Sequence, residues 1–136
     1  MPGRLYLDTS AVLRAALETG ITPDVEARIR QADVLITSRL AQVEAARVFL
    51  RLRSADTTAE ARLGDAEREV AALWARCELW ELTAEVCALA CQVAPTRSLR
   101  ALDALHLSTF LLARRRIEGL EMLSVDERLR DAAAVA

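Results

Sequence analysis

Short apolar segments alternate with longer helical segments along this chain, and this alternation constrains the fold more than any other feature. Strands are expected at residues 4–8, 33–37, 78–82 and 120–125. Helices are expected at residues 9–17, 23–31, 38–53, 59–77, 83–94 and 99–116, with a last helix from residue 126 into an Ala-rich tail. Strands that alternate with helices form a parallel sheet covered on both faces. The sequence therefore predicts an α/β fold.

Length and composition are those of an ordinary globular protein. The 136 residues fit one domain, which we expect to span residues 1–136. With 53% hydrophobic and 28% charged residues, the chain is neither disordered nor membranous in character. No apolar run approaches the roughly 20 residues that a membrane span needs. We therefore expect a cytoplasmic location and no membrane partner.

The charged residues exclude several classes of protein. A net charge of −2 gives the molecule no general attraction to nucleic acid. All 18 basic residues are arginine, and the chain contains no lysine. P-loop proteins, aspartyl-phosphate enzymes and phospho-acceptor receiver domains all rely on a lysine, so the sequence excludes these classes.

The three cysteines do not indicate a site. Cys87 and Cys91 lie one helical turn apart in an otherwise apolar segment. An odd number of cysteines does not suggest a disulfide framework, and their spacing is not that of a zinc site. We expect these side chains to be buried as small hydrophobic groups.

Four carboxylates are expected at one edge of the sheet. Asp8 follows the first strand and Asp126 follows the last, so both lie at the carboxyl edge, where α/β folds bind ligands. Glu44 lies in the second turn of the helix after the second strand, near the same edge. Asp103 lies in a helix that is apolar on nearly all sides, where an unpartnered carboxylate is unfavourable.

Each of these carboxylates, taken alone, also has a structural interpretation. Asp8 and Asp126 can cap the helices that they precede, because carboxylates bind well to the positive end of a helix. Glu44 can form an exposed ion pair with Arg47 or Arg51, which share its side of the helix.

The helix at residues 99–116 offers similar alternatives. Asp103 can pair with Arg100, three residues earlier. His106, three residues after Asp103, has no evident nucleophile as a partner, and we interpret it as structural. Taken together, however, four carboxylates at one edge repel one another unless their pKa values rise or they hold a divalent cation. Oxygen ligands favour Mg²⁺ or Mn²⁺ over zinc, and such a site suits metal-assisted attack of water on a phosphodiester.

Four motifs carry a family resemblance over residues 4–133. In order along the chain they are YLDTSAV, SRLAQVEAAR, LRALDALHL and LSVDERL. This ordered set resembles the PIN-domain ribonucleases, most closely the VapC-type toxins of prokaryotic toxin–antitoxin pairs. The resemblance implies a three-layer α/β/α sandwich with a central parallel sheet, and Mg²⁺- or Mn²⁺-dependent cleavage of RNA. It also implies a small antitoxin protein as a partner, and a homodimer.

One departure concerns the number of strands. Many relatives continue past the last helix into a further short strand, whereas this sequence ends with DAAAVA. The sheet is therefore expected to have four strands, with a fifth left open.

The resemblance also assigns roles to individual residues. The family's four acidic residues match Asp8, Glu44, Asp103 and Asp126. The resemblance implies that these carboxylates are both catalytic and metal-binding. Hydroxyl groups that support the metal site match Thr9, Ser10 and Ser124. RNA must reach an acidic pocket, so arginines are expected at its rim as phosphate contacts. The candidates are Arg47, Arg51, Arg100 and Arg114, with Arg115 and Arg116 next to the last of these. Each arginine can equally be solvated, or complement a helix dipole.

The leading hypothesis is thus a metal-dependent endoribonuclease that acts as the toxin of a VapBC-type pair. Two alternatives stay open. A catalytically weak PIN-like protein-interaction module would expose apolar surface, for instance at Trp74, Leu79 and Trp80. A PIN nuclease directed at DNA would use the same metal chemistry, since only contacts to the 2′-hydroxyl separate the two substrates.

Overall fold

In the computed structural model, which describes residues 3–136, four strands and seven helices follow one another in the order expected from the sequence. Element ends differ from the expected ones by a few residues. The elements are β1 (Arg4–Leu7), α1 (Thr9–Leu17), α2 (Pro23–Gln31), β2 (Val34–Ser38), α3 (Arg39–Ala55), α4 (Glu60–Arg76), β3 (Glu78–Trp80), α5 (Ala84–Ala90), α6 (Ala101–Arg116), β4 (Glu121–Leu123) and α7 (Glu127–Val135).

The four strands form one parallel sheet in the order β3-β2-β1-β4. β1 lies between β2 and β4, and Leu7 is opposite Leu123 in the register of β1 with β4. β2 also pairs with β3, where Ser38 is opposite Trp80. The carboxyl ends of all four strands therefore meet along one edge. Residues 3–136 form a sheet of four strands, as expected, without a fifth.

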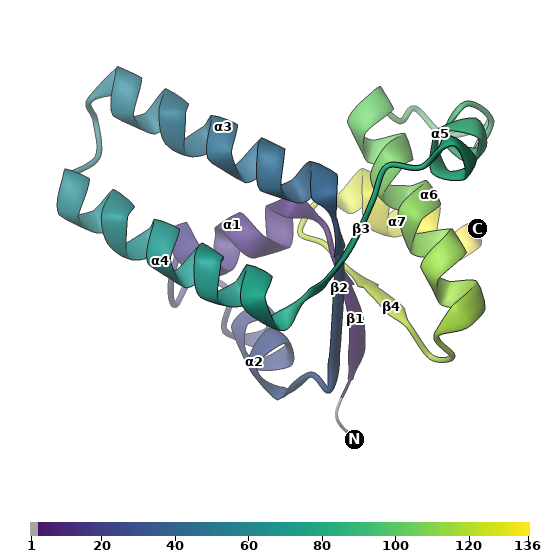
Figure 1. The fold of residues 1–136 in the computed structure, drawn as a ribbon, viewed down its shortest axis with the longest axis horizontal. Coiled ribbons are helices and arrows are strands. Elements are labelled where there is room, and N and C mark those ends of the chain that lie inside the picture. The colour runs from purple at the N-terminus through teal and green to yellow at the C-terminus, as the bar shows by residue number, and fades with distance from the viewer. Residues whose placement is uncertain (1–2) are drawn as a thin grey trace.

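Helices cover both faces of this sheet, which confirms the three-layer α/β/α sandwich (Figure 1). Successive side chains of a strand point to opposite faces. Leu5 and Leu7 accordingly belong to the hydrophobic core on the side of α1 to α4, whereas Tyr6 belongs to the core on the side of α6 and α7. The first core also buries Val12, Val25, Ile29, Phe49, Leu63 and Val70. The second also buries Ile36, Leu107, Phe110, Leu120 and Leu129.

α3 and α4 are the longest helices and extend together away from the sheet (Figure 1). α3 ends where Asp56 adopts a left-handed backbone conformation, with a φ of 51°. Arg53 forms ion pairs with Glu60 and Glu67 across the loop that follows. α3 carries Glu44, so the position of this helix decides where that carboxylate lies.

α6 is buried on nearly all sides, as its apolar sequence predicts. From Ala104 to Ala113, only Leu105 and Leu111 are not fully buried. The helix packs between the sheet, α5 and α7. It therefore brings Asp103 and His106, near its beginning, to the carboxyl edge of the sheet.

The expected burial of two cysteines is wrong. Cys87 and Cys91 are both exposed, and Cys77 is partly buried. The physical reason is that α5 is short and packs only one side against the protein, so Val86 is its one fully buried residue. The three thiols of the chain are free.

The large apolar residues named for an interaction module are not fully exposed. Trp74 packs against the first core, Trp80 packs against the second, and Leu79 is partly buried. None of the helices formed by residues 3–136 is both long and apolar enough to cross a membrane.

Candidate functional site

Asp8 is buried at the carboxyl end of β1, where only 4% of the residue is exposed. Its Oδ1 accepts a hydrogen bond from the backbone N–H of Ala11 at 3.1 Å, so Asp8 caps α1. The Ser10 hydroxyl lies 2.8 and 2.9 Å from the two carboxylate oxygens. The Ser124 hydroxyl donates to Oδ2 at 2.7 Å. Asp8 is therefore a helix cap, as the structural interpretation expects. The cap is only one of its contacts, because the Ser10 and Ser124 hydroxyls hold the same carboxylate.

Among residues 3–136, no cation forms a salt bridge with Asp8, and the groups that donate hydrogen bonds to its carboxylate are neutral. Burial raises the pKa of Asp8, although the bonds from Ser124, Ser10 and Ala11 partly oppose the increase. An ionised carboxylate in this position is incompletely compensated by the protein, and a bound cation would relieve that cost.

Glu44 faces the junction of β1 and α1 instead of its neighbours on α3. Its Oε1 accepts a hydrogen bond from the Thr9 hydroxyl at 2.6 Å and lies 2.6 Å from Nε2 of His106. The expected ion pairs with Arg47 and Arg51 do not form, because both arginines are exposed and make no salt bridge in the part of the chain that the structure describes.

The pKa of Glu44 reflects these contacts. Partial burial raises the pKa, but the hydrogen bonds from His106 and Thr9, together with the charge of Arg100, outweigh burial and lower the pKa below its usual value. Glu44 therefore stays ionised to a lower pH than a free glutamate.

His106 also belongs to this site, although the sequence suggests only a structural role for it. It is buried, with Nδ1 2.8 Å from the Tyr6 hydroxyl and Nε2 beside Glu44. Thr9 also lies 3.2 Å from Nε2. The sequence held one signal for this placement, since His106 follows Asp103 by three residues and shares its side of α6.

Asp103 lies in the first turn of α6, and its side chain is 14% exposed. The nearest cation is Arg100, with Nε 3.5 Å from Oδ2. This is the ion pair that the structural interpretation expects, but it is long and Arg100 is largely exposed, so it contributes little. The charge of Arg100 also acts on Glu44. Arg100 therefore lies close to two of the four carboxylates.

Asp126 caps α7, as the structural interpretation also expects. Its Oδ1 accepts from the backbone N–H groups of Arg128 and Leu129, at 3.0 and 3.5 Å. Its own N–H donates to the Ser124 hydroxyl at 3.0 Å. Ser124 thus links the start of α7 to the Asp8 carboxylate.

The donor chemistry at this edge fits a hard divalent cation. Within residues 3–136, no three Asp, Glu, His or Cys side chains already converge as a metal-binding group. Mg²⁺ does not require such convergence, because it keeps several waters and commonly uses one or two carboxylates. The buried, uncompensated Asp8 and the ionised Glu44 beside Thr9 supply oxygen ligands of that kind.

The arginines divide into two groups. Arg51 lies seven residues, or roughly 10 Å, beyond Glu44 along α3. Arg47 lies only three residues beyond Glu44, and Arg100 is the residue before α6 and pairs with Asp103, so these two lie toward the acidic edge, the carboxyl edge of the sheet with Asp8, Glu44 and Asp103. Arg114 does not, because eleven residues of helix place it roughly 16 Å along the axis from Asp103. Its guanidinium lies 5.1 Å from the centre of the Phe110 ring and donates to the carbonyl of Ala136 at 3.1 Å.

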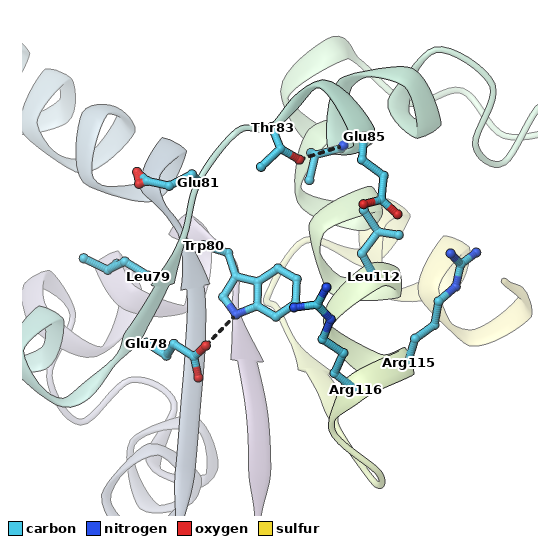
Figure 2. Close-up of a pocket in the computed structure, with 10 residues that line it drawn as sticks. Glu78, Leu79, Trp80, Glu81, Thr83, Glu85, Leu112, Arg115 and Arg116 are labelled. Carbon is cyan, nitrogen blue, oxygen red and sulfur yellow. Dashed lines mark hydrogen bonds between the residues drawn. The ribbon is translucent and has the colours of Figure 1, made fainter.

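A pocket of about 370 Å³ lies apart from the carboxylates, between β3, α5 and α6 (Figure 2). Arg115 and Arg116 line it, and the Arg116 guanidinium lies 5.6 Å from the centre of the Trp80 ring. The Trp80 indole N–H donates to Glu78 at 3.2 Å, as Figure 2 shows. None of the four carboxylates named above lines this pocket. The arginines at the end of α6 therefore belong to a different surface from the acidic edge.

Solved structures share this fold. PAE2754 from Pyrobaculum aerophilum matches with a TM-score of 0.68 and 17% identity, over 98% of this chain and 82% of that one. VapBC2 from Rickettsia felis, solved with a DNA fragment from its promoter, matches with a TM-score of 0.61 and 11% identity, over 90% of this chain and 98% of that one. VapC20 from Mycobacterium tuberculosis, a sarcin-ricin loop cleaving toxin, matches with a TM-score of 0.61 and 15% identity, over 94% of each chain.

Comparison of the sequence itself gives the family. No curated protein matches the chain. The family model of the PIN domain matches residues 5–135, which is nearly the whole chain. Its match includes the four motifs and all four carboxylates singled out from the sequence. This chain belongs to the PIN domain family.

Proposed function

We propose that this protein is a divalent-metal-dependent endoribonuclease and the toxin of a VapBC-type toxin–antitoxin pair. The observation that carries the proposal is the buried Asp8 carboxylate at the carboxyl edge of the sheet, which is held by hydroxyl groups from two segments and has no salt-bridge partner among the residues that the structure describes. Membership of the PIN family supports nuclease activity. The fold shared with VapC20, a loop-cleaving toxin, and with VapBC2 supports the toxin assignment.

Each residue of the site has a part in this proposal. Mg²⁺ or Mn²⁺ would be held by the catalytic carboxylates Asp8, Glu44, Asp103 and Asp126. The Thr9 hydroxyl holds Glu44 in a fixed orientation, and the Ser10 and Ser124 hydroxyls hold Asp8. When bound, the ion lowers the pKa of a water molecule, so that it can attack a phosphodiester, and neutralises charge that develops on the phosphate.

Substrate RNA would approach along α3 and the start of α6. Arg47 and Arg100 are exposed near the acidic edge, Arg51 is exposed further along α3, and all three can contact phosphates and so offset the negative charge of the RNA. Arg114 lies at the other end of α6 and does not share this role.

Two kinds of protein partner complete the proposal. Val43 and Leu50 lie on the outer side of α3 and are 56% and 54% exposed, and Leu82 and Leu102 are also exposed. Val43 and Leu50 are seven residues apart, so they share one side of the helix, and contiguous exposed apolar side chains are typical of surfaces that bind other proteins. We assign this side of α3 to a second copy of the chain or to a small antitoxin, in the cytoplasm.

The test is cleavage of a labelled RNA pool by antitoxin-free protein with Mg²⁺, Mn²⁺ or EDTA. We expect metal-dependent cleavage that both Asp8→Asn and Asp103→Asn abolish. Asp131→Asn is the matched control, since it removes an exposed carboxylate from α7 and should cleave like the wild type. Cleavage that survives both site substitutions would refute the assigned site. A folded protein without activity in any metal would favour the interaction module, and faster cleavage of DNA than of RNA would favour a DNA nuclease.

A further inference from the structure

We infer that His106 is a positioning residue for Glu44. The Nε2–H group of His106 holds one oxygen of the Glu44 carboxylate and leaves the other oxygen available to a cation. The inference rests on the proposed function, because it concerns how Glu44 meets a metal ion. It departs from the structural role that the sequence suggests for His106.

Two buried side chains form a hydrogen-bonded chain that ends at the partly buried Glu44. The Tyr6 hydroxyl lies 2.8 Å from Nδ1 of His106, and Nε2 of the same ring lies 2.6 Å from Oε1 of Glu44. Tyr6 comes from β1, His106 from α6 and Glu44 from α3, so the chain joins the sheet to two helices. Tyr6 also contacts the His106 ring edge to face, with ring centres 6.0 Å apart. The ring therefore has little freedom to turn.

The partner on each side of the ring fixes where its proton lies. A carboxylate can only accept a hydrogen bond, so the 2.6 Å contact of Nε2 with Oε1 of Glu44 places the imidazole proton on Nε2. Nδ1 of a neutral imidazole then has no proton and accepts a hydrogen bond from the Tyr6 hydroxyl, which is fully buried and lies 2.8 Å away.

The two oxygens of Glu44 are then unlike each other. Oε1 receives hydrogen bonds from both Thr9 and His106. Oε2 accepts none from residues 3–136, and the side chain is still 23% exposed. Hydrogen-bond donors behind a ligating carboxylate commonly fix its orientation, and their loss weakens metal binding. Oε2 is accordingly the atom of Glu44 that can face a cation.

The test measures Mn²⁺ binding to the full-length chain by isothermal titration calorimetry, in four variants. His106→Asn removes the donor to Glu44, because its shorter amide reaches only the Nδ1 position. His106→Gln keeps an N–H donor near the Nε2 position. Tyr6→Phe removes the donor that fixes the proton on Nε2. Leu107→Val changes the packing of the next buried residue on α6 and is the matched control.

We expect the Kd for Mn²⁺ to rise about 10- to 100-fold in His106→Asn. His106→Gln should recover most of this loss, Tyr6→Phe should show a smaller loss, and Leu107→Val should bind like the wild type. In the wild type, long-range ¹H–¹⁵N spectra of the imidazole should show the proton on Nε2. This spectrum does not depend on activity or on how well a variant folds.

Several results would overturn the inference. A proton on Nδ1, or equal Kd values for His106→Asn and the wild type, would refute it while leaving the proposed nuclease intact if the wild type binds Mn²⁺ and cleaves RNA. If His106→Asn does not fold, the comparison of Tyr6→Phe with Leu107→Val decides, and equal affinities refute the role. A wild type that neither binds Mn²⁺ nor cleaves RNA would refute both proposals.

Discussion

Ser124 donates a hydrogen bond of 2.7 Å to the Asp8 carboxylate from 116 positions further along the chain. The register of the sheet explains the contact. Leu7 is opposite Leu123 where β1 pairs with β4, so the residues that follow these two strands are neighbours. The backbone N–H of Asp8 also donates to the carbonyl of Leu123 at 3.3 Å. The position of this carboxylate is therefore set by backbone pairing as well as by its own side chain.

Asp8→Asn should stabilise the metal-free protein at pH 7 while removing cleavage. Burial raises the pKa of Asp8 in the folded state, so ionisation costs more there than in the unfolded chain. For a carboxyl group with a raised pKa, this cost is absent below the unfolded pKa and appears as pH rises through the folded pKa. We expect a gain of about 1 kcal/mol at pH 7 and little difference near pH 3. Urea unfolding in EDTA at pH 3, 5 and 7 measures the difference in free energy of unfolding between Asp8→Asn and the wild type. A variant that is less stable than the wild type at pH 7 would contradict the prediction.

Arg47→Gln should weaken RNA binding, whereas Arg114→Gln should not. Arg47 is exposed near the acidic edge, and Arg114 lies at the far end of α6. Removing one phosphate contact lowers the slope of log Kd against log salt concentration by about 1. The measurement is fluorescence anisotropy with a labelled single-stranded RNA, in an Asp8→Asn background that prevents cleavage. Equal effects of the two substitutions would exclude a specific path for RNA along α3.

Cys87 and Cys91 should react rapidly with a thiol reagent in the folded protein, and Cys77 should react slowly. The first two side chains are exposed. Burial raises the pKa of the Cys77 thiol to about 11, which leaves little of the reactive thiolate at neutral pH. Counting the thiols titrated by Ellman's reagent before and after addition of denaturant checks this. Three fast thiols in the native protein would mean that the end of α4 opens readily.

Phe49→Ala should cost about 3 to 5 kcal/mol of stability, because it leaves a cavity in the core between the sheet and α3. Phe49 is almost fully buried, five residues after Glu44 on the same helix. Phe49→Leu retains most of the apolar volume and should cost much less. Denaturant unfolding of the two variants measures both values. Similar losses would show that ring shape, and not the volume of the cavity, dominates at this position.

Much of the fold could be predicted from local patterns. The apolar run before Asp8 predicts β1, and the nearly continuous apolar sequence around His106 predicts the buried helix α6. The positions of Asp8 and Asp126 at one edge follow directly from the ends of two parallel strands. These placements depend on chain direction and strand order, which the alternation of elements already constrains.

The contact between Glu44 and His106 could not be predicted in the same way. It depends on how closely α3 and α6 approach above the sheet, and no spacing within either helix encodes that distance. The exposure of Cys87 and Cys91 was missed for a related reason, because an apolar segment does not reveal that its helix packs at the margin of the layer. The distance between Arg114 and Asp103 could be predicted from the sequence, since it follows from the rise per residue of the helix that contains both.

The hydrogen bond between Ser124 and Asp8 also has a consequence for the order of folding. Contacts between residues far apart in sequence form late, because a long loop must close before they are gained. β4 has only three residues and pairs with β1 alone. During synthesis, Asp8 and Glu44 would leave the ribosome long before Ser124, so a nascent chain holds the first carboxylates without the strand that fixes them. The acidic edge is thus completed only after β4 has left the ribosome and has paired with β1.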